Sequence, residues 1–109
     1  MSFVPQITFR NLDPSPAVEA AICEHAERLH RLHDRITSCR VVVETSHRRH
    51  KKGRIFRIGV DLTVPGAEIV VKRDPAEHHA HEDVYVAIRD AFDAVRRRLD
   101  DHSHRARGG

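Results

Sequence analysis

Five residues between positions 77 and 82 carry side chains that are able to bind a metal ion: Glu77, His78, His79, His81 and Glu82. Imidazole nitrogens and carboxylate oxygens are common ligands of zinc and nickel. The spacing differs from the HExxH pattern of helical zinc sites. A loop fixed by histidine hydrogen bonds, a solvated loop, or capping contacts where a helix begins at Asp83, is the competing interpretation. We therefore predict no metal site and no cofactor, with a small metal-binding regulatory protein using His78, His79 and His81 as the alternative function.

A second group of residues able to bind a ligand is the basic segment at positions 47–57, which contains no acidic residue. Six cations around a turn are suited to phosphate contacts with a nucleic acid. The competing interpretation is a solvated hairpin tip whose charges also protect a strand edge from pairing. The residues alone leave both interpretations open. The six cations are Arg48, Arg49, Lys51, Lys52, Arg54 and Arg57.

Further arginines fall on two predicted helices, where they form either a solvated face or a second row of phosphate contacts. The first helix adds Arg28 and Arg31, followed by Arg35. Aromatic residues make up 5% of the chain, too few for extensive stacking on bases. We therefore expect recognition of RNA shape and backbone. The candidate RNA-binding residues are Arg28, Arg31, Arg48, Arg49, Lys51, Lys52, Arg54, Arg89, Arg96 and Arg97.

Composition and motifs exclude several classes of protein. The chain has 109 residues and a net charge of +3, which fits one soluble domain with a modest core. It contains no GxSxG, P-loop or GxGxxG motif, so we predict that it is not an enzyme and has no small-molecule substrate. No apolar run approaches the ~20 residues of a membrane helix, and the first residues do not resemble a signal peptide. We expect a cytoplasmic protein in which Cys23 and Cys39 are buried or half-buried thiols.

Strands are predicted where apolar residues alternate with polar ones. The alternation covers residues 6–10, 40–47, 56–64 and 68–73, and the segment 56–64 is the clearest. Turns are expected at residues 51–53 and at Pro65-Gly66.

Two helices are predicted from apolar stripes at helical spacing. Ser15 suits the N-cap and Pro16 the first position of a helix that ends near His33. The last helix is expected at about residues 83–101, with Tyr85, Ile88, Phe92, Val95 and Leu99 on its buried stripe.

The order of elements, βαβββα, predicts an α+β fold. One apolar stripe on each helix and one apolar face on the long strand favour two helices packed on one face of a four-stranded mixed sheet. We expect residues 1–102 to form a single domain and residues 103–109 to form a flexible C-terminal tail.

Several local motifs occur in the order found in one known family. Ser15-Pro16-Ala17-Val18 is similar to its first helix start, and Leu62-Thr63-Val64-Pro65-Gly66 to its third strand and turn. The most specific match is His81-Glu82-Asp83-Val84-Tyr85 with Ala87-Ile88. Through these motifs the chain resembles the ribosome hibernation-promoting factor family, also called ribosome-associated inhibitor A or protein Y, in its short form. The resemblance covers about residues 6–102.

The resemblance implies a translation inhibitor that binds the small ribosomal subunit and its rRNA, and not DNA or a membrane. Family members occupy the mRNA channel and the tRNA sites, contact ribosomal RNA through basic residues, and take part in the stress response. Their fold is similar to a double-stranded RNA-binding domain with an added first strand. The resemblance assigns basic contact positions to Arg28 and Arg97. It also implies that this chain lacks the C-terminal domain with which long members pair ribosomes.

Overall fold

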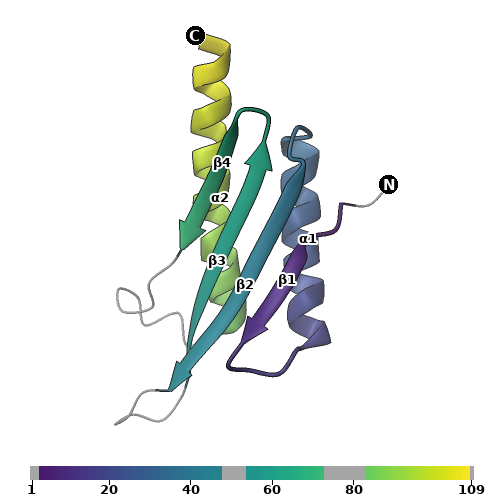
Figure 1. The fold of residues 1–109 in the computed structure, drawn as a ribbon, viewed down its shortest axis with the longest axis vertical. Coiled ribbons are helices and arrows are strands. Elements are labelled where there is room, and N and C mark those ends of the chain that lie inside the picture. Colours follow the sequence, from purple (N-terminus) through teal and green to yellow (C-terminus); the bar gives the residue numbers. More distant parts are fainter. Residues whose placement is uncertain (1–2, 48–53, 73–82, 109) are drawn as a thin grey trace.

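The computed structural model describes residues 3–47, 54–72 and 83–108 (Figure 1). The order of elements is the predicted βαβββα. The elements are β1 (Gln6–Arg10), α1 (Pro16–Leu32), β2 (Ser38–His47), β3 (Arg54–Val64), β4 (Ala67–Lys72) and α2 (Val84–Gly108).

The four strands form one mixed sheet in the order β1-β2-β3-β4. β1 pairs with β2 in parallel, whereas the two pairings that follow are antiparallel. The register aligns Ile7, Val41, Val60 and Val71 in one row across all four strands. Because side chains alternate between the two faces of a strand, this row belongs to the apolar face. The predicted fold class is confirmed.

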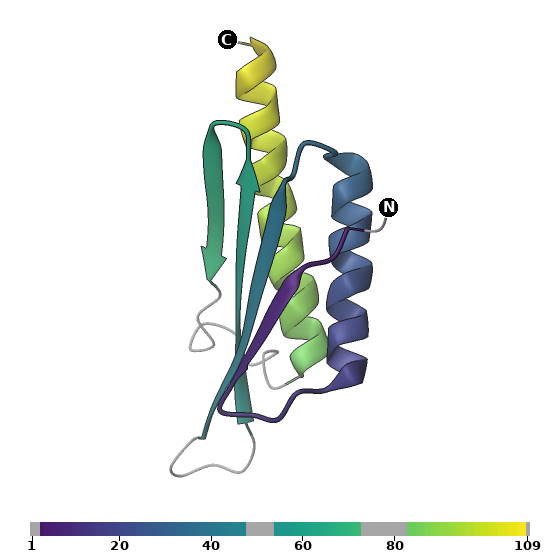
Figure 2. The same cartoon turned by 45° about the vertical axis from the view of Figure 1, so that its right-hand side comes forward.

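Both helices cover the same face of the sheet and leave the other face open (Figure 2). α1 buries Val18, Ile22, Ala26 and Leu29, the stripe that its sequence predicts. α2 packs on β3 and β4 and also against α1. The hydrophobic core is therefore a single layer between the helices and the sheet.

The ends of α1 follow from local chemistry. The Ser15 hydroxyl accepts a hydrogen bond from the Val18 amide at 3.3 Å, and Pro16 occupies the first turn. At the other end the His33 amide donates to the Leu29 carbonyl at 2.9 Å. The predicted helix start and end are confirmed.

The buried stripe of α2 differs from the prediction at its first turn. Tyr85 was expected in the core, but it is 49% exposed. The stripe is centred instead on Ile88, Ala91 and Val95, so Tyr85 falls at its margin. The buried alanines, Ala87 and Ala91, are small enough to let the helix approach the sheet closely.

The end of α2 also differs from the prediction. We expected the helix to stop at about residue 101, but it continues to Gly108. The last apolar residue of its stripe is Leu99, so burial does not define this end. Residues 102–107 contain no glycine or proline, and alanine and arginine are favourable in helices. The division into a domain and a flexible tail stays a prediction.

One of the two predicted turns lies within the described residues. Pro65-Gly66 connects β3 to β4, and Gly66 has a φ of 82°, a conformation that glycine adopts without a steric penalty. The turn expected at residues 51–53 and the histidine-rich loop at residues 74–82 lie outside the described residues.

Candidate nucleic-acid interface

Five of the predicted RNA-binding arginines lie on the outer side of the helix layer. Because each helix turns its apolar stripe toward the sheet, its polar residues point away from the core. All five side chains are exposed. We call this set the helix-pair surface; it consists of Arg28, Arg31, Arg89, Arg96 and Arg97.

Other predicted residues belong to the connection between β2 and β3. Arg48, Arg49, Lys51 and Lys52 lie outside the described residues. The backbone of Arg54 starts β3, paired with His47 at the end of β2. The role of this basic segment therefore stays a prediction.

The structure brings one predicted arginine from each helix together around His25. The imidazole of His25 on α1 stacks on Phe92 of α2, with the ring centroids 5.3 Å apart and the planes at 17°. Burial lowers the pKa of His25, and the positive charges of Arg28 and Arg89 lower it further. Both arginines therefore contribute positive potential at His25, on the helix-pair surface.

Acidic residues reduce the positive potential at this point. Asp93 and Glu24 act on His25 with the opposite sign and raise its pKa. Arg89 also lies 3.5 Å from a carboxylate oxygen of Asp90. Among the described residues, no carboxylate forms an ion pair with Arg28, Arg31, Arg96 or Arg97. Within the helix-pair surface, these four arginines are the cations most available to an external phosphate.

The open face of the sheet carries Arg57, the last cation of the basic segment at residues 47–57, and Arg40, which sequence reasoning did not single out. Arg40 lies 3.7 Å from Asp61 and Arg57 lies 3.6 Å from Glu44, each pair directly across neighbouring strands. Side chains alternate along a strand, so these residues lie opposite the core, and the register decides which charges face each other. Their pairing with acids makes Arg40 and Arg57 less available to a polyanion than Arg28, Arg31, Arg96 and Arg97.

The alternative function depends on a metal site in the histidine-rich loop. His78, His79 and His81 lie outside the described residues, so the site stays a prediction that elemental analysis of the untagged protein checks. Within the described parts of the chain, no cluster of three or more histidine, cysteine or acidic residues is arranged to hold a metal ion.

The cysteines are free thiols of low reactivity. Cys39 is buried and Cys23 half-buried, as the sequence predicts. Burial raises the pKa of Cys39 to about 12 and also raises that of Cys23. Because the thiolate is the reactive form, neither residue is activated as a nucleophile. None of the helices in the described residues is long and apolar enough to cross a membrane.

Fold and charge together define a small α+β domain whose helix layer carries exposed arginines, with no activated nucleophile among its described cysteines. A family model described as "Sigma 54 modulation protein / S30EA ribosomal protein" matches residues 6–107. The chain belongs to this family, which confirms the resemblance seen in the motifs.

Two curated relatives are similar in sequence. A ribosome hibernation promotion factor of Deinococcus radiodurans is 35% identical over 94 residues, which is 86% of this chain and 46% of the relative. A ribosome hibernation promoting factor of Azotobacter vinelandii is 32% identical over 99 residues, which is 91% of this chain and 81% of the relative. The chain thus spans about half the length of the Deinococcus protein. Neither relative carries the name of an enzyme, in agreement with the sequence prediction.

Two solved structures share the fold. The N-terminal domain of Thermus thermophilus Protein Y has a TM-score of 0.71 at 21% identity, covering 92% of this chain and 98% of that domain. A ribosomal subunit interface protein from Coxiella burnetii has a TM-score of 0.72 at 16% identity, covering 94% and 99% of the two chains.

Proposed function

We propose that this protein is a ribosome-binding translation inhibitor, a hibernation factor that acts by occupancy. Family membership over residues 6–107 is the observation that carries the proposal. The names of the two curated relatives support the same function. Such a protein works in the cytoplasm, performs no chemical step, and needs no cofactor.

The proposed site on the ribosome is the mRNA channel and the tRNA sites of the small subunit. Contacts run from the helix-pair surface and the basic segment at residues 47–57 to phosphates of ribosomal RNA. The availability of Arg28, Arg31, Arg96 and Arg97 supports this assignment, because each can form a charge-assisted hydrogen bond to a phosphate oxygen. Occupancy of this channel excludes mRNA and tRNA without any catalysis.

The direct test is sedimentation with purified small ribosomal subunits. We expect co-migration at low salt and displacement of the protein by bound mRNA and tRNA. Absence of co-migration at low salt contradicts ribosome binding. Co-migration that mRNA and tRNA leave unchanged contradicts the location in the channel.

A matched pair of charge reversals tests the helix-pair surface. The variant Arg96→Glu/Arg97→Glu should bind small subunits at least about tenfold more weakly, because it replaces two phosphate contacts by repulsion. The control Arg10→Glu/Lys72→Glu makes the same change in net charge at exposed positions of the open sheet face. It should bind within about twofold of the unmodified protein. Equal losses in both variants contradict a specific role of α2.

A further inference from the structure

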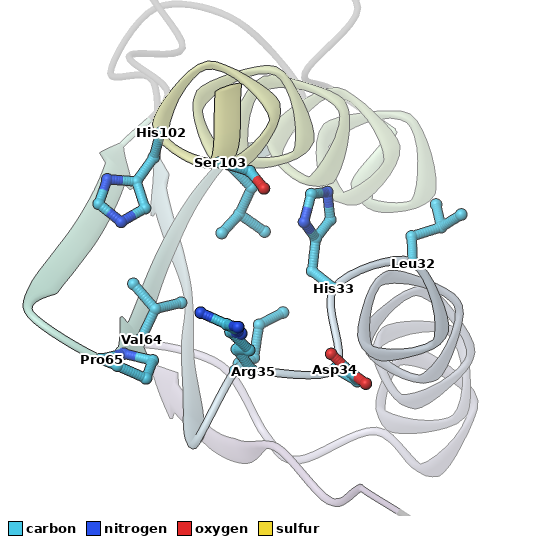
Figure 3. Close-up of a pocket in the computed structure, with 10 residues that line it drawn as sticks. Leu32, His33, Asp34, Arg35, Val64, Pro65, His102 and Ser103 are labelled. Carbon is cyan, nitrogen blue, oxygen red and sulfur yellow. The ribbon is translucent and has the colours of Figure 1, made fainter. Parts of the chain in front are cut away.

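A pocket of about 380 Å³ lies where α1 ends, outside the helix-pair surface. Its walls come from the connection between α1 and β2, the turn between β3 and β4, and α2 (Figure 3). Ile36, Val64 and Leu99 form an apolar floor, and each is at most 7% exposed. In Figure 3, the side chains of His102 and Ser103 extend from α2 into the pocket, and the side chain of Arg35 extends toward them from the opposite side.

Contacts between the elements hold the walls in place. His33 Nε2 and Asp100 Oδ1 are 2.8 Å apart and join the end of α1 to α2. The Thr37 amide donates to the Thr63 carbonyl at 2.8 Å, which fixes the connection that carries Arg35 beside β3. A ligand therefore meets a largely preformed site, which reduces the ordering that binding requires.

The polar groups of the pocket divide into donors and acceptors. Arg35 has no ion-pair partner among the described residues, and His102 and Ser103 add further hydrogen-bond donors beside it. The C-terminal end of α1 forms another wall and carries partial negative charge. Asp34, next to this end, adds acceptor oxygens. The complementary ligand thus has an anionic group, an apolar flat part and a donor.

We propose that this pocket binds one nucleotide. Its phosphate contacts the guanidinium of Arg35 and the donors of His102 and Ser103. The base lies on the apolar floor, with its exocyclic amino group toward Asp34 and the end of α1. Single bases removed from a stack are commonly recognised by such combinations of stacking and edge contacts.

Simpler ligands leave part of this chemistry unused. Inorganic phosphate has no contact with the floor of Ile36, Val64 and Leu99. An apolar molecule without charge leaves the guanidinium of Arg35, which is exposed at the pocket, without an anionic partner. The same nucleotide chemistry can come from a free nucleotide or from an unstacked residue of RNA. The proposal goes beyond ribosome binding, because a free nucleotide would occupy the pocket without a ribosome.

Titration of the full chain with 5′-AMP, monitored by amide resonances, tests the site. We expect saturable shifts in amides of the pocket lining, and at least about tenfold weaker binding of adenosine and of inorganic phosphate. No shift at millimolar AMP, or equal binding of phosphate and AMP, overturns the proposal.

Two variants separate the pocket from general charge effects. Arg35→Gln should weaken AMP binding at least about tenfold by removing the charge that faces the phosphate. Arg10→Gln removes the same charge at an exposed position on β1 and should bind AMP as the unmodified protein does. Equal effects of the two substitutions overturn the assignment to Arg35.

Small-subunit binding by Arg35→Gln then identifies the source of the nucleotide. A loss of ribosome affinity, with competition by AMP, assigns the pocket to an RNA residue. Unchanged ribosome affinity assigns it to a free nucleotide. Both results support the proposal, and the AMP titration stands even for a protein that fails to bind ribosomes.

Discussion

At the scale of single residues, His25 has an environment that its sequence position does not reveal. It is half-buried between the helices, where it stacks on Phe92. Its folded-state pKa lies below the ordinary value of 6.5, first because of burial and then because of Arg28. In the unfolded chain these influences are absent. His25 therefore links protonation to folding.

The sign of this linkage gives a prediction. Between the lowered folded pKa and 6.5, the unfolded state binds more protons, so acidification through this window favours unfolding. We expect the contribution of His25 to stability to be present at pH above 6.5 and to decrease below it. In His25→Gln, urea unfolding should lose less stability between neutral pH and pH ~5.5 than in the unmodified protein. Identical losses, or an NMR titration midpoint of His25 above 6.5, contradict this prediction.

At the scale of elements, each helix is held by the stripe that it buries. α2 is the clearer case, because its exposed residues between positions 89 and 104 are all charged or polar, while Ile88 is fully buried against the sheet. The edge of β4 is covered from the same helix, since Arg98 donates a hydrogen bond to the Val70 carbonyl. Such cover reduces the tendency of a strand edge to pair with another chain.

Shortening a side chain of the buried stripe should therefore lower the free energy of unfolding. Ile88→Ala removes a side chain with no exposed surface, and we expect a loss of about 2–5 kcal/mol in the free energy of unfolding. The control substitution Asp101→Ala, at an exposed position of the same helix, should change the free energy of unfolding by no more than about 0.5 kcal/mol. Urea denaturation of both variants measures the difference. Similar losses would show that α2 contributes little through its buried stripe.

At the scale of the whole molecule, function is predicted to depend on how charge is divided between the two faces. The helix layer presents arginines without ion-pair partners among the described residues, whereas the open sheet face pairs Arg40 and Arg57 with acids. A net charge of +3 is too small to account for strong attraction to RNA by itself. The local arrangement of charges is therefore the relevant property.

The salt dependence of ribosome binding measures this arrangement. Each phosphate contact releases counterions and contributes about −0.7 to −0.9 to the slope of log K against log salt concentration. We expect a clearly negative slope for the unmodified protein. In Arg96→Ala/Arg97→Ala the slope should be less negative by about 1.4 to 1.8, because two contacts are lost. An unchanged slope would remove these arginines from the phosphate contacts.

Local patterns in the amino-acid sequence were enough to predict the order of elements, the start of α1 and the exposed positions of the arginines. These features depend on local periodicity, capping chemistry and alternation, which act over a few residues. Two features differed from the sequence prediction: Tyr85 is exposed, and α2 extends to Gly108. Local pattern specifies the margins of a buried stripe and the ends of a helix only weakly. The tertiary structure was needed to show that Arg28 and Arg89, from different helices, both lower the pKa of His25, and that Arg35 faces His102 and Ser103 across one pocket. The physical reason is that these contacts join residues far apart in the chain, whose approach depends on packing and strand register.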